Sequence, residues 1–116
     1  MAFAATRDGA RAREFYESVL GLSVLSEDHF ALVLDANGTM LRLQKVESFL
    51  PSPFTALGWE VSNIRVAVSE LQKRGVTFQK YPWMDQDELG IWRSPSGASV
   101  AWFKDPDGNT LSLTEF

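Results

Sequence analysis

Few residues in this chain have the types and spacing that catalysis usually requires. His29 is the only histidine, it follows Glu27-Asp28 in an expected turn, and no nearby serine or carboxylate pattern indicates a catalytic triad. We therefore expect His29 to be an exposed polar residue. The chain has no cysteine, which excludes disulfides, thiolate metal sites and cysteine nucleophiles.

Aromatic side chains are better candidates for ligand binding. The chain has four tryptophans, and alternation along an expected strand places one of them, Trp59, in the core. Trp83, Trp92 and Trp102 could form an aromatic wall, because such walls bind flat or cationic ligands by stacking and by attraction to the ring quadrupole. The alternative for each is that it fills a core or an interface, which is the more common role of tryptophan in small domains.

The helices that must position these residues occur twice. After Asp8-Gly9, apolar residues recur at helical spacing until Gly21 supplies a stop. After Asn63 the pattern returns and ends at Gly75. The apolar stripes consist of Ala12, Phe15, Tyr16, Val19 and Leu20 in the first copy and of Ile64, Ala67, Val68 and Leu71 in the second.

Two glycine turns, each followed by an alternating strand, repeat in the same way. The segment DANGTMLRL at 35–43 aligns without gaps on DPDGNTLSL at 105–113. Both predict a tight turn and then a strand with one buried face. The hairpins lie farther apart than the helices, so the second copy carries an insertion between its helix and its hairpin.

The insertion covers 80–93 and contains Trp83 together with Asp85, Asp87 and Glu88. Inserted loops on a repeated scaffold often carry specificity, although a solvated connection with one anchoring tryptophan is an equal alternative. The three acids could form a rim that attracts cations. Solvation of the loop is the favoured interpretation, because it is the more common role of such acids.

The remaining strands, predicted from alternation and β-propensity, complete a single α+β domain. Residues 1–116 would form two βαβββ modules, the first at about 1–46 and the second at about 54–116, in a curled mixed sheet with helices on its outer face. The other face must then curl around something or meet another subunit. The predicted strands are 2–6, 23–26, 30–34, 57–61, 91–93 and 99–103.

Composition limits the possible partners. The 116 residues suit one domain, and 45% hydrophobic with 22% charged residues is typical of a water-soluble globule. The net charge of −4 and the scattered basic residues argue against nucleic acid as a partner. No apolar run could cross a bilayer and no secretory signal is evident, so we expect no membrane association and a cytoplasmic location.

Three short motifs follow one another along the chain. They are RAREFY at 11–16 with VLGL at 19–22, then GWEV at 58–61, and finally DPDGN at 105–109. In this combination the chain resembles the vicinal oxygen chelate superfamily over essentially its whole length. That superfamily includes glyoxalases, extradiol dioxygenases, fosfomycin-resistance transferases and bleomycin-resistance proteins. The resemblance implies paired βαβββ modules whose sheets curl into a half-open trough, usually assembled as homodimers with the ligand in the trough.

Enzymes of this superfamily hold a divalent metal at four positions, usually through histidine and glutamate. The resemblance places these positions at Met1, Arg42, Ala56 and Ser112. A thioether suits soft ions, alanine has no donor atom, arginine is a fixed cation, and a neutral serine hydroxyl alone is a poor ligand. We therefore expect no metal and no other cofactor.

Strand parity assigns side chains to the trough. Arg42 and Glu60 would lie near the position of the metal, either as a salt bridge or as ligand contacts. As ligand contacts, Arg42 would orient an anionic or carbonyl group and Glu60 would accept a hydrogen bond or a proton. The candidate ligand-binding set is Arg42, Gln44, Glu60, Trp83, Trp92, Trp102 and Ser112, with catalytic residues unassigned.

The resemblance and the missing ligands favour a metal-independent, homodimeric protein that sequesters a planar or cationic small molecule, as bleomycin-resistance proteins do. The alternative is a metal-dependent lyase or dioxygenase of the glyoxalase type that recruits its metal through Glu60, His29 or Gln44. A third hypothesis, from another class, is a structural or regulatory module whose trough is filled.

Overall fold

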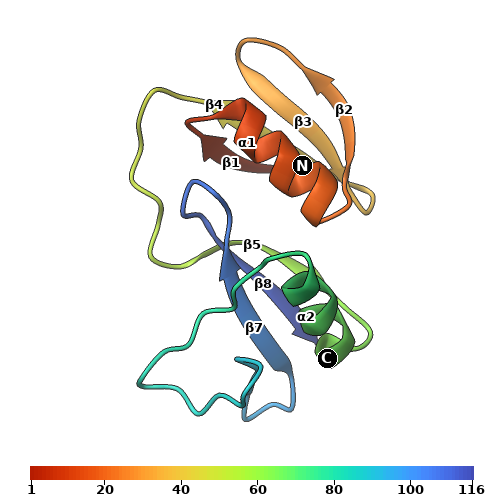
Figure 1. The fold of residues 1–116 in the computed structure, drawn as a ribbon, viewed down its shortest axis with the longest axis vertical. Helices are drawn as coiled ribbons and strands as arrows, with labels where there is room; N and C mark the ends of the chain where they lie inside the picture. The colour runs from red at the N-terminus through yellow and green to blue at the C-terminus, as the bar shows by residue number, and fades with distance from the viewer. The chain divides into compact units, whose positions relative to one another are not determined.

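The computed structural model describes residues 1–116 and divides them into two compact units (Figure 1). The first unit comprises Met1–Ser52 with the loop Asp105–Asn109, and the second comprises Pro53–Lys104 with Thr110–Phe116. Each unit has one four-stranded sheet and one helical segment, and each half of the chain has the order βαβββ. The predicted α+β class with two βαβββ modules is confirmed.

The first unit contains strands β1 (Ala2–Thr6), β2 (Ser23–Glu27), β3 (Ala31–Ala36) and β4 (Thr39–Lys45) in the order β1-β4-β3-β2. β1 and β4 are parallel and the other pairs are antiparallel. Opposed residues share a face of a sheet. The core face of this sheet accordingly carries the register pairs Leu32–Leu43 and Leu34–Leu41, all four of which are buried.

The helical segment of the first unit consists of an α-helix followed by a π-helix. Asp8 caps α1 (Gly9–Arg13) by accepting a hydrogen bond from the Arg11 backbone N–H, as expected for a helix start. The segment η1 (Glu14–Val19) is a π-helix, which ends as the Leu20 N–H donates to the Phe15 carbonyl at 3.0 Å. The prediction of one α-helix up to Gly21 is wrong for this half, because a short apolar stripe is compatible with both windings.

The two glycine turns differ in conformation despite their aligned sequences. In the first, Asn37 and Gly38 both have positive φ, 55° and 94°, as a two-residue hairpin turn requires. In the second, only Gly108 does, and the Asp105 N–H bonds to the Asn109 carbonyl across a longer loop. Pro106 aligns with Ala36, which closes the first turn by pairing with Thr39. Proline has no backbone N–H for such a closing pair, which disfavours the first type of turn here.

The second unit contains β5 (Thr55–Glu60), α2 (Ile64–Lys73), β6 (Trp92–Arg93), β7 (Ser99–Lys104) and β8 (Thr110–Glu115). The strand order is β5-β8-β7-β6, with β5 parallel to β8 and the rest antiparallel. Asn63 caps α2 by accepting from the Val66 N–H, so both predicted helix starts are confirmed.

The core of the second unit lies between α2 and one face of its sheet. The predicted stripe residues Ile64, Val68 and Leu71 are buried on α2, and the facing strands bury Phe103 and Leu111 completely. Burying one such large aliphatic or aromatic side chain contributes about 1.5–3 kcal/mol. This hydrophobic contact fixes which face of the sheet is closed and which stays open.

The loop Asp105–Asn109 packs within the first unit although it joins β7 to β8. Asp105 accepts hydrogen bonds from the Tyr16 hydroxyl at 2.7 Å and from the backbone and side chain of Asn109. Asp107 accepts from the Thr6 hydroxyl and the Arg7 N–H. Asp105, Asp107 and Asn109 are all buried, so this motif is structural.

Tyr16 gives the fold a dependence on alkaline pH. Its ring is fully buried, and burial, followed by the charge of Asp105, raises the pKa of its hydroxyl far above the ordinary value. Since an unfolded tyrosine ionises near about pH 10, the stability that this group contributes is complete below that pH and is lost as the pH rises. We predict that the free energy of unfolding falls by about 1.4 kcal/mol per pH unit above about pH 10 through this residue alone.

Urea denaturation between neutral and alkaline pH, on the wild type and on Tyr16→Phe, measures this contribution. The variant loses a hydrogen bond to a charged group, which costs about 1.5–3 kcal/mol at neutral pH, but it lacks the alkaline slope. The gap between the two proteins should therefore narrow above about pH 10. Tyr81→Phe is the matched control, and parallel curves for wild type and Tyr16→Phe would contradict the prediction.

Candidate functional site

The open face of the second sheet carries most of the predicted site residues. In register, Gly58, Ser112 and Trp102 form one cross-strand row. The next row consists of Glu60, Thr114, Val100 and Trp92. Residues in such rows share a face, so Glu60, Trp92, Trp102 and Ser112 lie together on the face that α2 does not cover. Trp59, half-buried, is on the opposite face with Leu113.

The three predicted tryptophans belong to one continuous series of aromatic rings. The ring centres of Trp92 and Trp102 are 6.1 Å apart, those of Trp102 and Tyr81 6.0 Å, and those of Tyr81 and Trp83 5.0 Å. The Trp102 indole N–H donates to the Thr55 hydroxyl at 3.1 Å, which fixes the ring. Trp83 at the end of the series is 76% exposed. We call Tyr81, Trp83, Trp92 and Trp102 the aromatic row.

Tyr81 is the member of the row that the sequence interpretation missed. It lies two residues before Trp83 in the insertion, and its ring links Trp83 to Trp102. Gln86 holds it in place, because the Gln86 side chain accepts from the Tyr81 N–H and donates to the carbonyls of Gln79 and Gly90. The Tyr-Pro-Trp sequence was the available signal, since two aromatic residues around a proline are typical of a fixed turn.

The acidic residues of the insertion do more than solvate the loop. One oxygen of Asp87 accepts from the Leu89 and Ile91 N–H groups and the other from Arg65 at 3.0 Å. Arg65 also donates to Glu88, and this hydrogen bond, aided by the charges of Glu88 and Asp87, raises the Arg65 pKa. The favoured interpretation, solvation alone, is therefore wrong for Asp87. Asp85 is exposed.

The other predicted site residues belong to the first unit. Arg42 and Gln44 lie on β4 and share its open face with Met40. Arg42 is half-buried and lies opposite Phe3 of β1 and Val33 of β3 in the strand register. The Arg42–Glu60 pair would join the two units and stays a prediction. His29 is exposed.

The residues at the four expected metal positions do not fit a divalent ion. Met1 is 72% exposed, and Arg42, Ala56 and Ser112 bring a cation, a methyl group and a neutral hydroxyl. No group of three or more histidine or acidic side chains elsewhere has an arrangement that could hold a metal. The donor chemistry thus differs from that of the metal-dependent enzymes in the group that the sequence resembles.

Comparison with known families agrees with the fold. The family model for the Glyoxalase/Bleomycin resistance protein/Dioxygenase superfamily matches residues 2–113. The chain belongs to this superfamily. A comparison with curated proteins gave no match.

Solved structures with the same fold come from several bacteria. A superfamily member from Sphaerobacter thermophilus DSM 20745 is 26% identical, with a TM-score of 0.76 over 99% of this chain and 94% of that one. A glyoxalase family protein from Enterococcus faecalis is 23% identical, with a TM-score of 0.75 over 99% and 94%. Lactoylglutathione lyase from Agrobacterium tumefaciens is 14% identical, with a TM-score of 0.74 over 99% and 92%.

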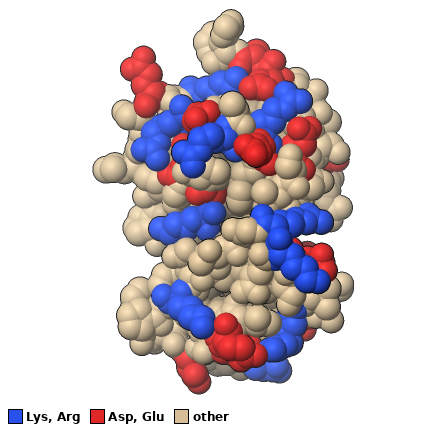
Figure 2. Space-filling view, viewed as in Figure 1, with Lys and Arg blue, Asp and Glu red and all other residues tan.

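The surface and the helices add two further observations. Figure 2 shows lysines and arginines interspersed with acidic residues on the visible face, which is the scattered distribution expected from the sequence. Neither α1 nor α2 has the length and apolar character that a bilayer-spanning helix needs.

Gly58 is required by close packing on the open face. A Cβ atom at this position would lie 2.7 Å from the Ser112 Oγ atom, which is too close for both to stay in place. We predict that Gly58→Ala destabilises the protein by about 1–3 kcal/mol, the usual cost of overpacking. Urea denaturation would measure the change.

The double variant Gly58→Ala/Ser112→Ala is the matched test of this cause. Removing the Ser112 hydroxyl removes the clashing atom, so the double variant should regain most of the lost stability relative to Gly58→Ala. If the double variant instead lost as much stability as Gly58→Ala and Ser112→Ala lose together, the Gly58–Ser112 contact would not be the cause of the destabilisation.

Proposed function

We propose that this protein is a metal-independent small-molecule-binding protein that sequesters a planar or cationic compound, in the manner of bleomycin-resistance proteins. The aromatic row on the open face of the second sheet supports this proposal most directly. Indole and phenol rings offer flat faces of negative electrostatic potential, which attract flat rings and organic cations.

The charge beside the aromatic row favours a cation. Glu60 is exposed, is on the same face, and shares its cross-strand row with Trp92. A carboxylate at the edge of an aromatic surface adds a directional attraction for a ligand ammonium or amidinium group. Ser112 is in register with Trp102 and is only 6% exposed, so in this proposal its hydroxyl serves a ligand that reaches down to the sheet.

Residues of the first unit would complete the site in a homodimer. Phe3 and Met40 are 63% and 41% exposed on the open face of the first sheet, next to Arg42 and Gln44. Exposed apolar side chains grouped on one sheet face are typical of a surface that meets a partner. In this proposal Arg42 and Gln44 contact the ligand or the second copy.

Binding is tested by tryptophan fluorescence with 9-aminoacridine as a flat cation and anthracene-9-carboxylate as a flat anion. We expect saturable quenching by the cation and weaker binding of the anion. Trp102→Leu should weaken cation binding about tenfold, the effect of losing about 1.4 kcal/mol of ring and cation–π contact. Glu60→Gln should weaken the cation more than the anion.

Trp59→Phe is the matched control, because Trp59 lies on the opposite face of the sheet. Equal losses in Trp59→Phe and Trp102→Leu, or no saturable quenching by either compound, would contradict binding at the aromatic row. Thermal unfolding of each variant separates lost binding from lost folding.

The absence of a bound metal is tested separately from ligand binding. Elemental analysis of protein purified without chelators should find no stoichiometric zinc, nickel, manganese or iron, since the four expected positions lack suitable donors. Dialysis against a chelator should leave the binding constant for 9-aminoacridine unchanged. A stoichiometric transition metal would instead favour the glyoxalase- or dioxygenase-type enzyme.

A further inference from the structure

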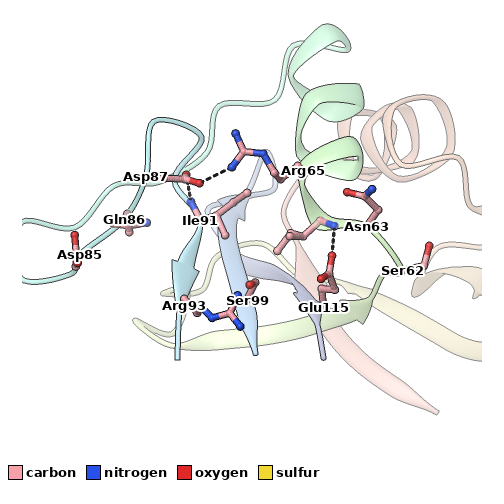
Figure 3. Close-up of a pocket in the computed structure, with 11 residues that line it drawn as sticks. Ser62, Asn63, Arg65, Asp85, Gln86, Asp87, Ile91, Arg93, Ser99 and Glu115 are labelled. Carbon is pink, nitrogen blue, oxygen red and sulfur yellow. Dashed lines mark hydrogen bonds and ion pairs between the residues drawn. The ribbon is translucent and has the colours of Figure 1, made fainter. Parts of the chain in front are cut away.

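A cavity lies on the helix side of the second sheet, on the face opposite to the aromatic row. Its volume is about 640 Å³, and it is lined by the first turn of α2, by the insertion around Asp87, and by the ends of β6, β7 and β8 (Figure 3). A cavity of this size is within the usual range for small-molecule sites.

Hydrogen bonds hold the walls of this cavity in place. Asp87 binds Arg65 of α2 on one side and the Ile91 N–H on the other, as the dashed lines in Figure 3 mark. The Glu115 carboxylate accepts from the Ile64 N–H at 2.9 Å and so satisfies a backbone donor at the start of α2. A ligand would therefore enter a site that already exists and would not have to order it.

Three side chains on the floor form a row with separated charges. Arg93, Ser99 and Glu115 occupy adjacent strands in register and all line the cavity. Arg65 and Asp87 are already paired with each other. By contrast, the Arg93 guanidinium and the Ser99 hydroxyl form no hydrogen bond or ion pair within the chain, and Glu115 uses only Oε1. Figure 3 shows the Arg93 side chain running beside Ser99.

We propose that this cavity binds the head group of a small α-amino acid. Arg93 takes the ligand carboxylate through the two-pronged contact that guanidinium favours, Ser99 donates its hydroxyl to the same group, and Glu115 Oε2 accepts from the ligand ammonium. The order of the row, cation then hydroxyl then anion, is complementary to a zwitterion.

The spacing of the row suits this head group. Arg93 and Glu115 are separated by two inter-strand steps, about 9.6 Å between their backbones. The amine nitrogen and the nearer carboxylate oxygen of an α-amino acid lie about 2.7 Å apart, and a charge-assisted hydrogen bond of about 2.8 Å is added on each side. The sum is shorter than the span, so both contacts can form at once with the side chains flanking the ligand.

Apolar atoms in the wall indicate the rest of the ligand. Ile64 and Ile91 are both buried and both line the cavity. They offer an aliphatic surface next to the charged row, which suits a short aliphatic side chain better than a charged one. A leucine-like amino acid combines these features.

Backbone amide shifts of the isotope-labelled full chain would test this site with three matched probes: L-leucine, 4-methylpentanoate and 3-methylbutylamine. We expect saturable shifts with L-leucine, centred on Ile64, Ile91, Arg93 and Ser99, and much weaker effects with the two probes that carry a single charge. Shifts centred on the aromatic row, or equal affinity for 4-methylpentanoate, would overturn the proposal, as would the absence of saturation with L-leucine.

Two charge-removing variants test the roles of the row. Arg93→Gln and Glu115→Gln should each weaken L-leucine binding about tenfold or more, since each loses one charge-assisted contact. Glu115→Gln keeps an oxygen that can accept from the Ile64 N–H, so α2 should remain capped. Arg74→Gln at the other end of α2 is the control that should bind normally. Unchanged affinity in Arg93→Gln with an intact fold would also overturn the proposal.

Discussion

One helix can cover only one face of a four-stranded sheet, and this constraint determines where the protein can do chemistry. Strand side chains alternate between faces, so packing Ile64, Val68 and Leu71 of α2 against one face of the second sheet leaves the other face without a covering helix. The open face then carries Glu60, Ser112 and two tryptophans. A slip of one residue in register would bury these groups and expose the core.

The insertion between α2 and β6 serves both faces of the second sheet. Gln86 fixes the backbone near Tyr81 and thereby places the outer rings of the aromatic row. The next residue, Asp87, ties the same loop to Arg65 of α2 and forms a wall of the cavity on the helix side. Side-chain hydrogen bonds to the backbone replace regular secondary structure here, which explains how a long connection keeps a defined conformation.

The most prominent acidic motif of the chain takes no part in these sites. Asp105 and Asp107 are buried and accept hydrogen bonds from Tyr16, Thr6 and Arg7 of the first unit. Two carboxylates used in this way stabilise a loop but are closed to ligands. The corresponding Asp35 only accepts from the Gly38 N–H in its exposed turn, so the same motif has acquired different roles in the two copies.

The sequence by itself determined the duplicated βαβββ architecture, both helix starts and the buried faces of β4, β5 and β8, because these follow from local periodicity, capping residues and the pleat of a strand. The residue types at the four positions that the resemblance assigns to a metal, Met1, Arg42, Ala56 and Ser112, are likewise a property of the sequence alone. The tertiary structure alone decided the π-helical winding, the role of Asp87 and the assembly of the aromatic row. Those features depend on contacts between residues far apart in the chain, such as Tyr81 with Trp102 and Arg65 with Asp87, and no local pattern encodes such distances.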